Sequence, residues 1–101
     1  MKIKRIKRLK VNAIDFKVIW DNKVQGATID YRMEEIIIGT DGLKEPEIFM
    51  LVCHELMEIC AIEMCVRLSR PDCEGDYIFV YDHRQHQTMM QMFSGLLREF
   101  L

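Results

Sequence analysis

The residues of this chain that could carry chemistry are concentrated in positions 53–58, which read CHELME. They lie inside the apolar run of residues 48–68, which has no Gly or Pro and predicts a largely buried helix. His54 and Glu58 are four residues apart, so both side chains should leave one helix face about 6 Å apart, with Glu55 on the flank. Because burying charged groups without partners is costly, these side chains need compensation.

Three kinds of compensation fit the pattern. The polar stripe could face water, it could form an internal hydrogen-bond network, or it could bind a divalent metal ion. A third ligand for such an ion could come from the last predicted helix, where His86 borders the apolar stripe and His83 lies nearer to solvent. His54, Glu58 and His86 together provide two imidazoles and one carboxylate, which is typical of catalytic zinc and also of non-haem iron.

Two further groups bear on this site. At 100° per residue, Glu47 and Cys65 fall on the same helical stripe as His54 and Glu58, and Glu47 or Asp82 could orient a ligand imidazole. No CxxC pair occurs in the chain, and we expect its cysteines to be reduced, buried small hydrophobes rather than disulfides or a zinc knuckle. The four cysteines are Cys53, Cys60, Cys65 and Cys73.

The elements that position these residues follow from hydrophobic periodicity. Residues 11–20 alternate between apolar and polar, residues 23–31 continue as a second strand, and the β-branched run 34–39 predicts a third. After the buried helix, residues 77–81 predict a short strand or an extended connection. Asp82, with Gln85 three residues on, predicts the N-cap of a last helix over residues 83–100. The expected fold is α+β, with a small, three- to four-stranded, mainly antiparallel sheet.

Length and charge bound the possible functions. A chain of 101 residues with 14 basic and 16 acidic side chains fits one domain and is not a globally basic protein that coats nucleic acid. Residues 1–10 hold six basic side chains and no acid. We expect this segment to be a solvated strand or a frayed terminus ahead of a domain at 11–101; the alternative is a tail that contacts phosphate or an acidic partner. We expect a cytoplasmic protein with a peptide or protein partner, and no membrane or nucleic-acid partner. The oligomeric state stays open, and a homo-oligomer is one possibility.

With these residues in place, the sequence resembles a zincin-like metallopeptidase domain of the compact gluzincin type found in phages and mobile elements. Such domains carry HExxH on a buried helix behind a small sheet. His54 matches the first histidine and Glu55 the catalytic glutamate, whereas Glu58 replaces the second histidine. His86 stands where the family has a downstream Glu ligand. The resemblance implies a zinc ion (alternatively Fe²⁺ or Mn²⁺, or no metal) on His54, Glu58 and His86.

The resemblance implies zinc-dependent peptide-bond hydrolysis, with Glu55 as the base that activates the metal-bound water. The strand at residues 34–39 would be a sheet edge that holds an extended peptide. The departure at Glu58 favours an alternative, a non-catalytic protein-binding module on the same fold, such as a phage or mobile-element accessory protein. A third possibility is a plain α+β domain with an oligomer surface rich in methionine, as in residues 89–92.

Overall fold

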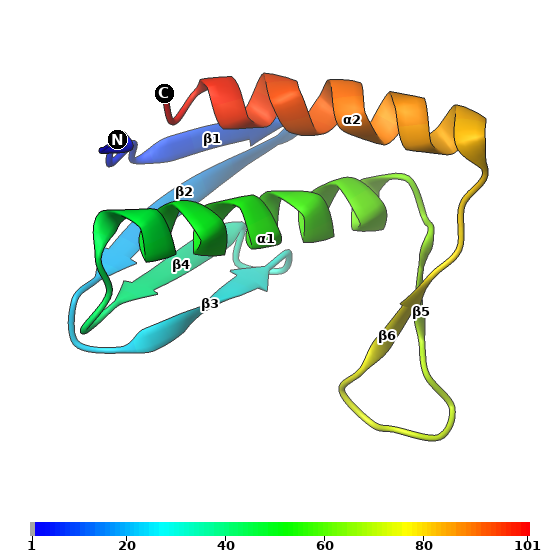
Figure 1. Ribbon diagram of the computed structural model, residues 1–101, viewed down its shortest axis with the longest axis horizontal. Helices are drawn as coiled ribbons and strands as arrows, with labels where there is room; N and C mark the ends of the chain where they lie inside the picture. Colours follow the sequence, from blue (N-terminus) through cyan, green and yellow to red (C-terminus); the bar gives the residue numbers. More distant parts are fainter. Residues whose placement is uncertain (1) are drawn as a thin grey trace.

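The computed structural model describes residues 2–101 and confirms the α+β class (Figure 1). A four-stranded sheet carries two helices on one side, and a two-stranded hairpin extends from the body between the helices. In chain order the elements are β1 (Arg8–Val11), β2 (Ile14–Asp21), β3 (Gln25–Asp30), β4 (Glu35–Thr40), α1 (Glu45–Glu63), β5 (Arg67–Ser69), β6 (Tyr77–Phe79) and α2 (His83–Arg98).

The main sheet has the strand order β1-β2-β4-β3. β1 pairs with β2 and β3 with β4 in antiparallel fashion, whereas the central pair β2–β4 is parallel. β4 therefore lies inside the sheet, and the prediction that residues 34–39 form an edge strand is wrong. In the run of three isoleucines at 36–38, Ile36 and Ile38 are buried and Ile37 is partly buried, so β4 is apolar on both faces, which is typical of an interior strand. The edges are β1 and β3.

The basic N-terminal segment is part of the fold. Ile3 and Leu9 are both buried, and the Trp20 indole Nε1 donates a 2.8 Å hydrogen bond to the Ile6 carbonyl. β1 continues to Val11, across the predicted boundary between residues 10 and 11, and turns into β2 at Asn12, whose φ is 54°. Apolar residues at every third position, Ile3, Ile6 and Leu9, thus anchor a segment whose other side chains are mostly basic.

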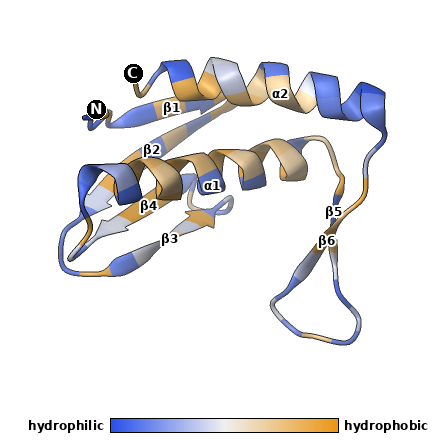
Figure 2. Ribbon diagram, viewed as in Figure 1, coloured by the Kyte–Doolittle hydropathy of each residue, from blue (hydrophilic) through white to orange (hydrophobic). Residues whose placement is uncertain are grey.

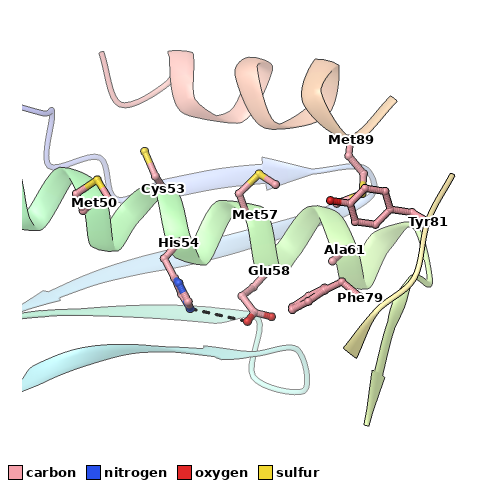
Figure 3. A pocket seen from close by; sticks show the side chains of 9 residues that line it. All are labelled: Met50, Cys53, His54, Met57, Glu58, Ala61, Phe79, Tyr81 and Met89. Carbon is pink, nitrogen blue, oxygen red and sulfur yellow. Dashed lines mark ion pairs between the residues drawn. The ribbon is translucent and has the colours of Figure 1, made fainter. Parts of the chain in front are cut away.

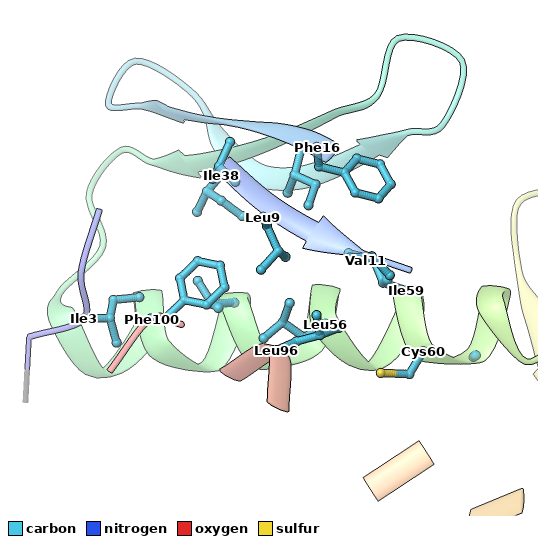
Figure 4. Close-up of a cluster of buried hydrophobic side chains, with 14 of the residues drawn as sticks. Ile3, Leu9, Val11, Phe16, Ile38, Leu56, Ile59, Cys60, Leu96 and Phe100 are labelled. Atoms are coloured by element: carbon cyan, nitrogen blue, oxygen red, sulfur yellow. The ribbon is translucent and has the colours of Figure 1, made fainter. Parts of the chain in front are cut away.

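The core lies between the sheet and the two helices (Figure 4). Phe16 of β2 and Ile38 of β4 point toward Leu56 and Ile59 of α1, and Phe100 follows α2 into the same cluster. Figure 2 shows that α1 is apolar along most of its length, whereas the first turns of α2 are hydrophilic. α1 therefore carries more apolar surface than the sheet alone covers.

α1 ends five residues earlier than the sequence predicts. The Cys65 N–H donates to the Ile62 carbonyl and the Val66 N–H to the Ala61 carbonyl, both at 3.0 Å, which is the Schellman pattern of a helix C-terminus. Cys65 occupies the left-handed position with φ 58°. That position usually holds glycine, so the sequence contains no signal for the end, and Leu68 belongs to β5 instead of the helix.

The last helix is predicted correctly. Asp82 is its N-cap: Oδ1 accepts a 2.8 Å hydrogen bond from the Gln85 N–H, and Gln85 Oε1 accepts one from the Asp82 N–H at 2.9 Å. Residues 77–81 contain β6, as expected for a short strand or extended connection. Within residues 2–101, neither helix is long and apolar enough to cross a membrane.

Candidate functional site

Glu58 connects α1 to the hairpin. Its Oε1 lies 3.8 Å from His54 Nε2, and its Oε2 accepts a 3.0 Å hydrogen bond from Arg67 Nη1 at the start of β5. The Arg67 guanidinium also lies 3.9 Å from the centre of the Tyr77 ring on β6. The Glu58 side chain is 17% exposed and that of His54 is 66% exposed. Glu58, one of the two acids of the predicted site, thus contacts a cationic side chain.

Glu55 faces a small polar pocket between α1 and the edge strand β3, which Glu58 and Arg67 also line. Partial burial raises the pKa of the Glu55 carboxyl, and the neighbouring Glu58 carboxylate raises it further, while His54 and Arg67 act in the opposite direction. Tyr31 lines the pocket as well, and its hydroxyl donates a 3.0 Å hydrogen bond to Glu63. The pocket holds polar groups of both signs.

The two histidines of α2 lie apart from His54. The ring of His86 stacks on Tyr81, with centroids 5.9 Å apart and planes at 17°, and on His83 at 6.5 Å. His86 is exposed, whereas Met89, one turn further on, is buried and lines a pocket with residues of α1. The structure therefore brings His54, Glu55 and Glu58 together without His83 or His86.

These residues do not fit a three-ligand metal site. Among residues 2–101, no group of three or more His, Cys, Asp or Glu side chains is arranged to hold a metal ion. His54 and Glu58 could share one ion, but the second oxygen of Glu58 already accepts from the Arg67 guanidinium, whose charge would repel a cation. No catalytic step through a metal follows from this arrangement.

The remaining predicted neighbours of the site have other surroundings. Cys65 is outside the helix and exposed, Cys73 is also exposed, and Cys60 is the one cysteine that is fully buried. All four cysteines are free, as expected, but the prediction that all are buried is wrong. Glu47 accepts a 3.0 Å hydrogen bond from the Lys44 N–H, so its carboxylate caps the start of α1.

An apolar groove along α1 is the feature that the sequence reasoning missed (Figure 3). Its volume is about 400 Å³. In Figure 3 Met50, Cys53 and Met57 project from α1 and Met89 comes from α2, while the aromatic rings of Phe79 and Tyr81 close one end. The lining residues are Met50, Cys53, His54, Met57, Glu58, Ala61, Phe79, Tyr81 and Met89.

This groove continues into an exposed apolar hairpin. Met50 is 67% exposed and Phe79 is 45% exposed, which is unusual for side chains of this size. Leu68, Ile78 and Val80 on the hairpin are exposed as well. The signal in the sequence was the apolar character of α1 on almost every face, which one small sheet cannot cover.

Comparisons with protein-family models, curated proteins and solved structures found no match for this chain.

Proposed function

We propose that this protein is a non-catalytic protein-binding module that docks a basic amphipathic helix of its partner in the groove along α1. The observation that carries this proposal is an exposed, methionine-lined groove set in an acidic part of the molecule. The zincin-like resemblance then concerns the arrangement of the helix and the sheet, without the peptidase chemistry.

The apolar lining supports a protein partner. Met50, Met57 and Met89 line the groove, and Phe79 and Tyr81 add aromatic surface. Contiguous apolar surface of this kind marks interaction sites, since water solvates it poorly. Methionine side chains are flexible and polarisable, so they adapt to differently shaped apolar side chains of a partner.

The charges around the groove predict the charge of the partner surface that binds there. Residues 45–82, from α1 through the hairpin, contain nine acidic and two basic side chains. Both basic side chains are already paired: Arg67 with Glu58, and Arg70 with Asp72 at 2.9 Å and Asp76 at 3.6 Å. A partner with lysine or arginine beside its apolar anchors would complement this charge.

The spacing along α1 favours a helix as the occupant. Met50, His54, Met57 and Ala61 follow each other at intervals of three or four residues, so they lie along one side of α1. A second helix laid alongside would meet one of these side chains at each turn. Helices bound in apolar grooves present anchors with the same spacing.

The test uses a designed peptide as the probe. A Leu/Lys amphipathic peptide of about 18 residues is long enough to form a helix, and calorimetry would measure its affinity. We expect it to bind, and we expect at least tenfold weaker binding for Met57→Lys, which places a positive charge in the groove. The matched control is Met33→Lys, because Met33 is equally apolar, is 59% exposed and lies between β3 and β4 away from the groove.

Three results of this experiment would contradict parts of the proposal. Binding of a peptide with the same composition but scrambled leucines, or an equal loss in the Met33 variant, would contradict docking of an amphipathic helix. A Leu/Glu peptide that binds as well as the Leu/Lys peptide would contradict the charge argument.

The peptidase alternative has its own measurement. Mass spectrometry of protein purified without chelator would determine bound metal in the wild type and in His54→Ala and His86→Ala. One equivalent of zinc that both variants lose would overturn the non-catalytic proposal and favour the peptidase. Absence of metal, even after zinc is added, would support the non-catalytic proposal.

A further inference from the structure

Positive charge is concentrated at a second hollow, which is formed by β1, β2 and the segment before them. This hollow has a volume of about 570 Å³. We propose that it binds the phosphate backbone of single-stranded nucleic acid, independently of the groove along α1. The residues that line it are Arg5, Lys7, Arg8, Lys17, Val18, Ile19 and Trp20.

The strand register concentrates positive charge here. Arg8 of β1 pairs directly with Lys17 of β2, and both side chains are exposed. Like charges at directly opposed positions destabilise a sheet. In the part of the chain that the structure describes, Lys7, Arg8 and Lys17 have no ion-pair partner, and no acidic side chain lines the hollow. An anionic ligand would relieve this repulsion.

Protection of a sheet edge explains only part of the pattern. Charged side chains on an edge strand prevent pairing with other chains, and this accounts for Arg8 on β1. Lys17 belongs to β2, and its partner on β4 is Glu35, so an acidic side chain stands opposite it on that side. Lys7 lies before β1 and lines the same hollow, so neither sheet-edge protection nor this cross-strand pair explains its charge.

Trp20 and Arg5 both line the hollow, and the Trp20 ring also meets the core residue Phe100 edge to face. The Arg5 guanidinium lies 4.9 Å from the centre of the Trp20 ring, and Arg5 is also fixed by an ion pair with Glu45 of α1. Unpaired bases stack on aromatic rings and guanidinium planes beside a positively charged groove. Since the Trp20 N–H is already donated to Ile6, the indole cannot read a base edge, and we expect little sequence preference.

The same surface does not suit a membrane. Insertion into a lipid headgroup layer requires exposed large apolar side chains beside the basic ones. Val18 is buried, Ile19 and Trp20 are partly buried, and the exposed large apolar side chains of residues 2–101 lie elsewhere. The favoured source of phosphate is therefore a nucleic-acid strand.

Trp20 is the single tryptophan of the chain, so its fluorescence reports on this hollow. We expect an oligothymidylate of about 12 nucleotides to quench it at 50 mM salt. If Lys7, Arg8 and Lys17 each contact one phosphate, the logarithm of the affinity should fall with the logarithm of the salt concentration at a slope of about −2. The double variant Arg8→Ala/Lys17→Ala should bind about tenfold more weakly, with a slope reduced by about 1.4.

The matched control is Lys23→Ala, because Lys23 is an exposed lysine in the turn between β2 and β3 outside the hollow. We expect its affinity to stay within about twofold of the wild type, and circular dichroism would confirm that each variant is folded. Absence of binding, or equal affinity in the folded double variant, would overturn the proposal. The proposal would also be overturned if poly-glutamate, phosphatidylserine vesicles or inorganic phosphate bound as tightly as the oligonucleotide at the same concentration of anionic groups.

Discussion

The groove along α1 and the hollow on β1 and β2 differ in composition and in origin. The groove is apolar, lies among acidic residues and combines side chains from α1, β6 and α2. The hollow is basic and is formed by two strands adjacent in the sequence, with the short segment before them. A net charge of −2 conceals this separation, because the two signs nearly cancel over the whole chain.

One small core supports these two surfaces of opposite character. The inward residues of β1 and β2 enter the core, while their outward neighbours form the basic side. α1 faces the sheet with one side and presents the groove on another. Both surfaces therefore depend on the same buried side chains, although their ligands would have opposite charges.

The largest expected effect follows from removing a side chain of that shared core. Leu56 is 1% exposed and lies among the core residues between α1 and the sheet. Leu56→Ala should lower the free energy of unfolding by about 2–5 kcal/mol, because it removes apolar contacts and leaves a cavity. Chemical denaturation would measure this, with the exposed Val24→Ala as a control expected to stay within about 0.5 kcal/mol. Loss of peptide binding without loss of oligonucleotide binding in a partly unfolded sample would contradict a shared core.

A substitution of intermediate effect should weaken binding at the groove and leave binding at the hollow unchanged. Arg67→Ala removes the contacts with Glu58 and with the Tyr77 ring, so the hairpin that closes one end of the groove should detach from α1. We expect several-fold weaker binding of the basic peptide, unchanged binding of the oligonucleotide and faster amide hydrogen exchange in β5 and β6.

Arg70→Ala is the control for this effect. Arg70 forms its ion pairs with Asp72 and Asp76 within the hairpin itself. If its removal weakened peptide binding as much as Arg67→Ala, attachment of the hairpin to α1 would not be the cause.

The smallest expected effect concerns Glu55 and its pH dependence. Its pKa is raised, mainly by burial, so the ionised carboxylate is less favourable in the folded than in the unfolded protein. The stability contribution of the protonated form is complete below the unfolded pKa of about 4.3 and is lost as pH rises through the folded pKa. Glu55→Gln should therefore match the wild-type Tm near pH 4 and exceed it slightly at pH 7. A lower Tm at pH 7 would mean that the carboxylate is held by His54 or Arg67 more strongly than burial opposes it.

Much of the fold could be predicted from the sequence. Alternation in residues 11–20, the apolar run containing Leu56 and the Asp82 cap depend on neighbours in the chain, so they identified a strand, the buried helix and the start of the last helix. The early end of α1 could not be predicted, because Cys65 adopts a conformation that its residue type rarely favours.

The candidate site, like the fold, could be predicted from the sequence only in part. The sequence by itself placed His54, Glu55 and Glu58 within one turn or so of each other, because helical spacing alone determines that proximity. It could not show that Arg67 would reach Glu58 or that His86 would stack on Tyr81, since both contacts depend on the path of the chain between α1 and α2. The interior place of β4 and the groove beside Met57 likewise required the chain to be packed. Local spacing determined which side chains share a helix face, and only the tertiary structure decided which partners they meet, because those partners lie on other elements, whose placement helical spacing does not determine.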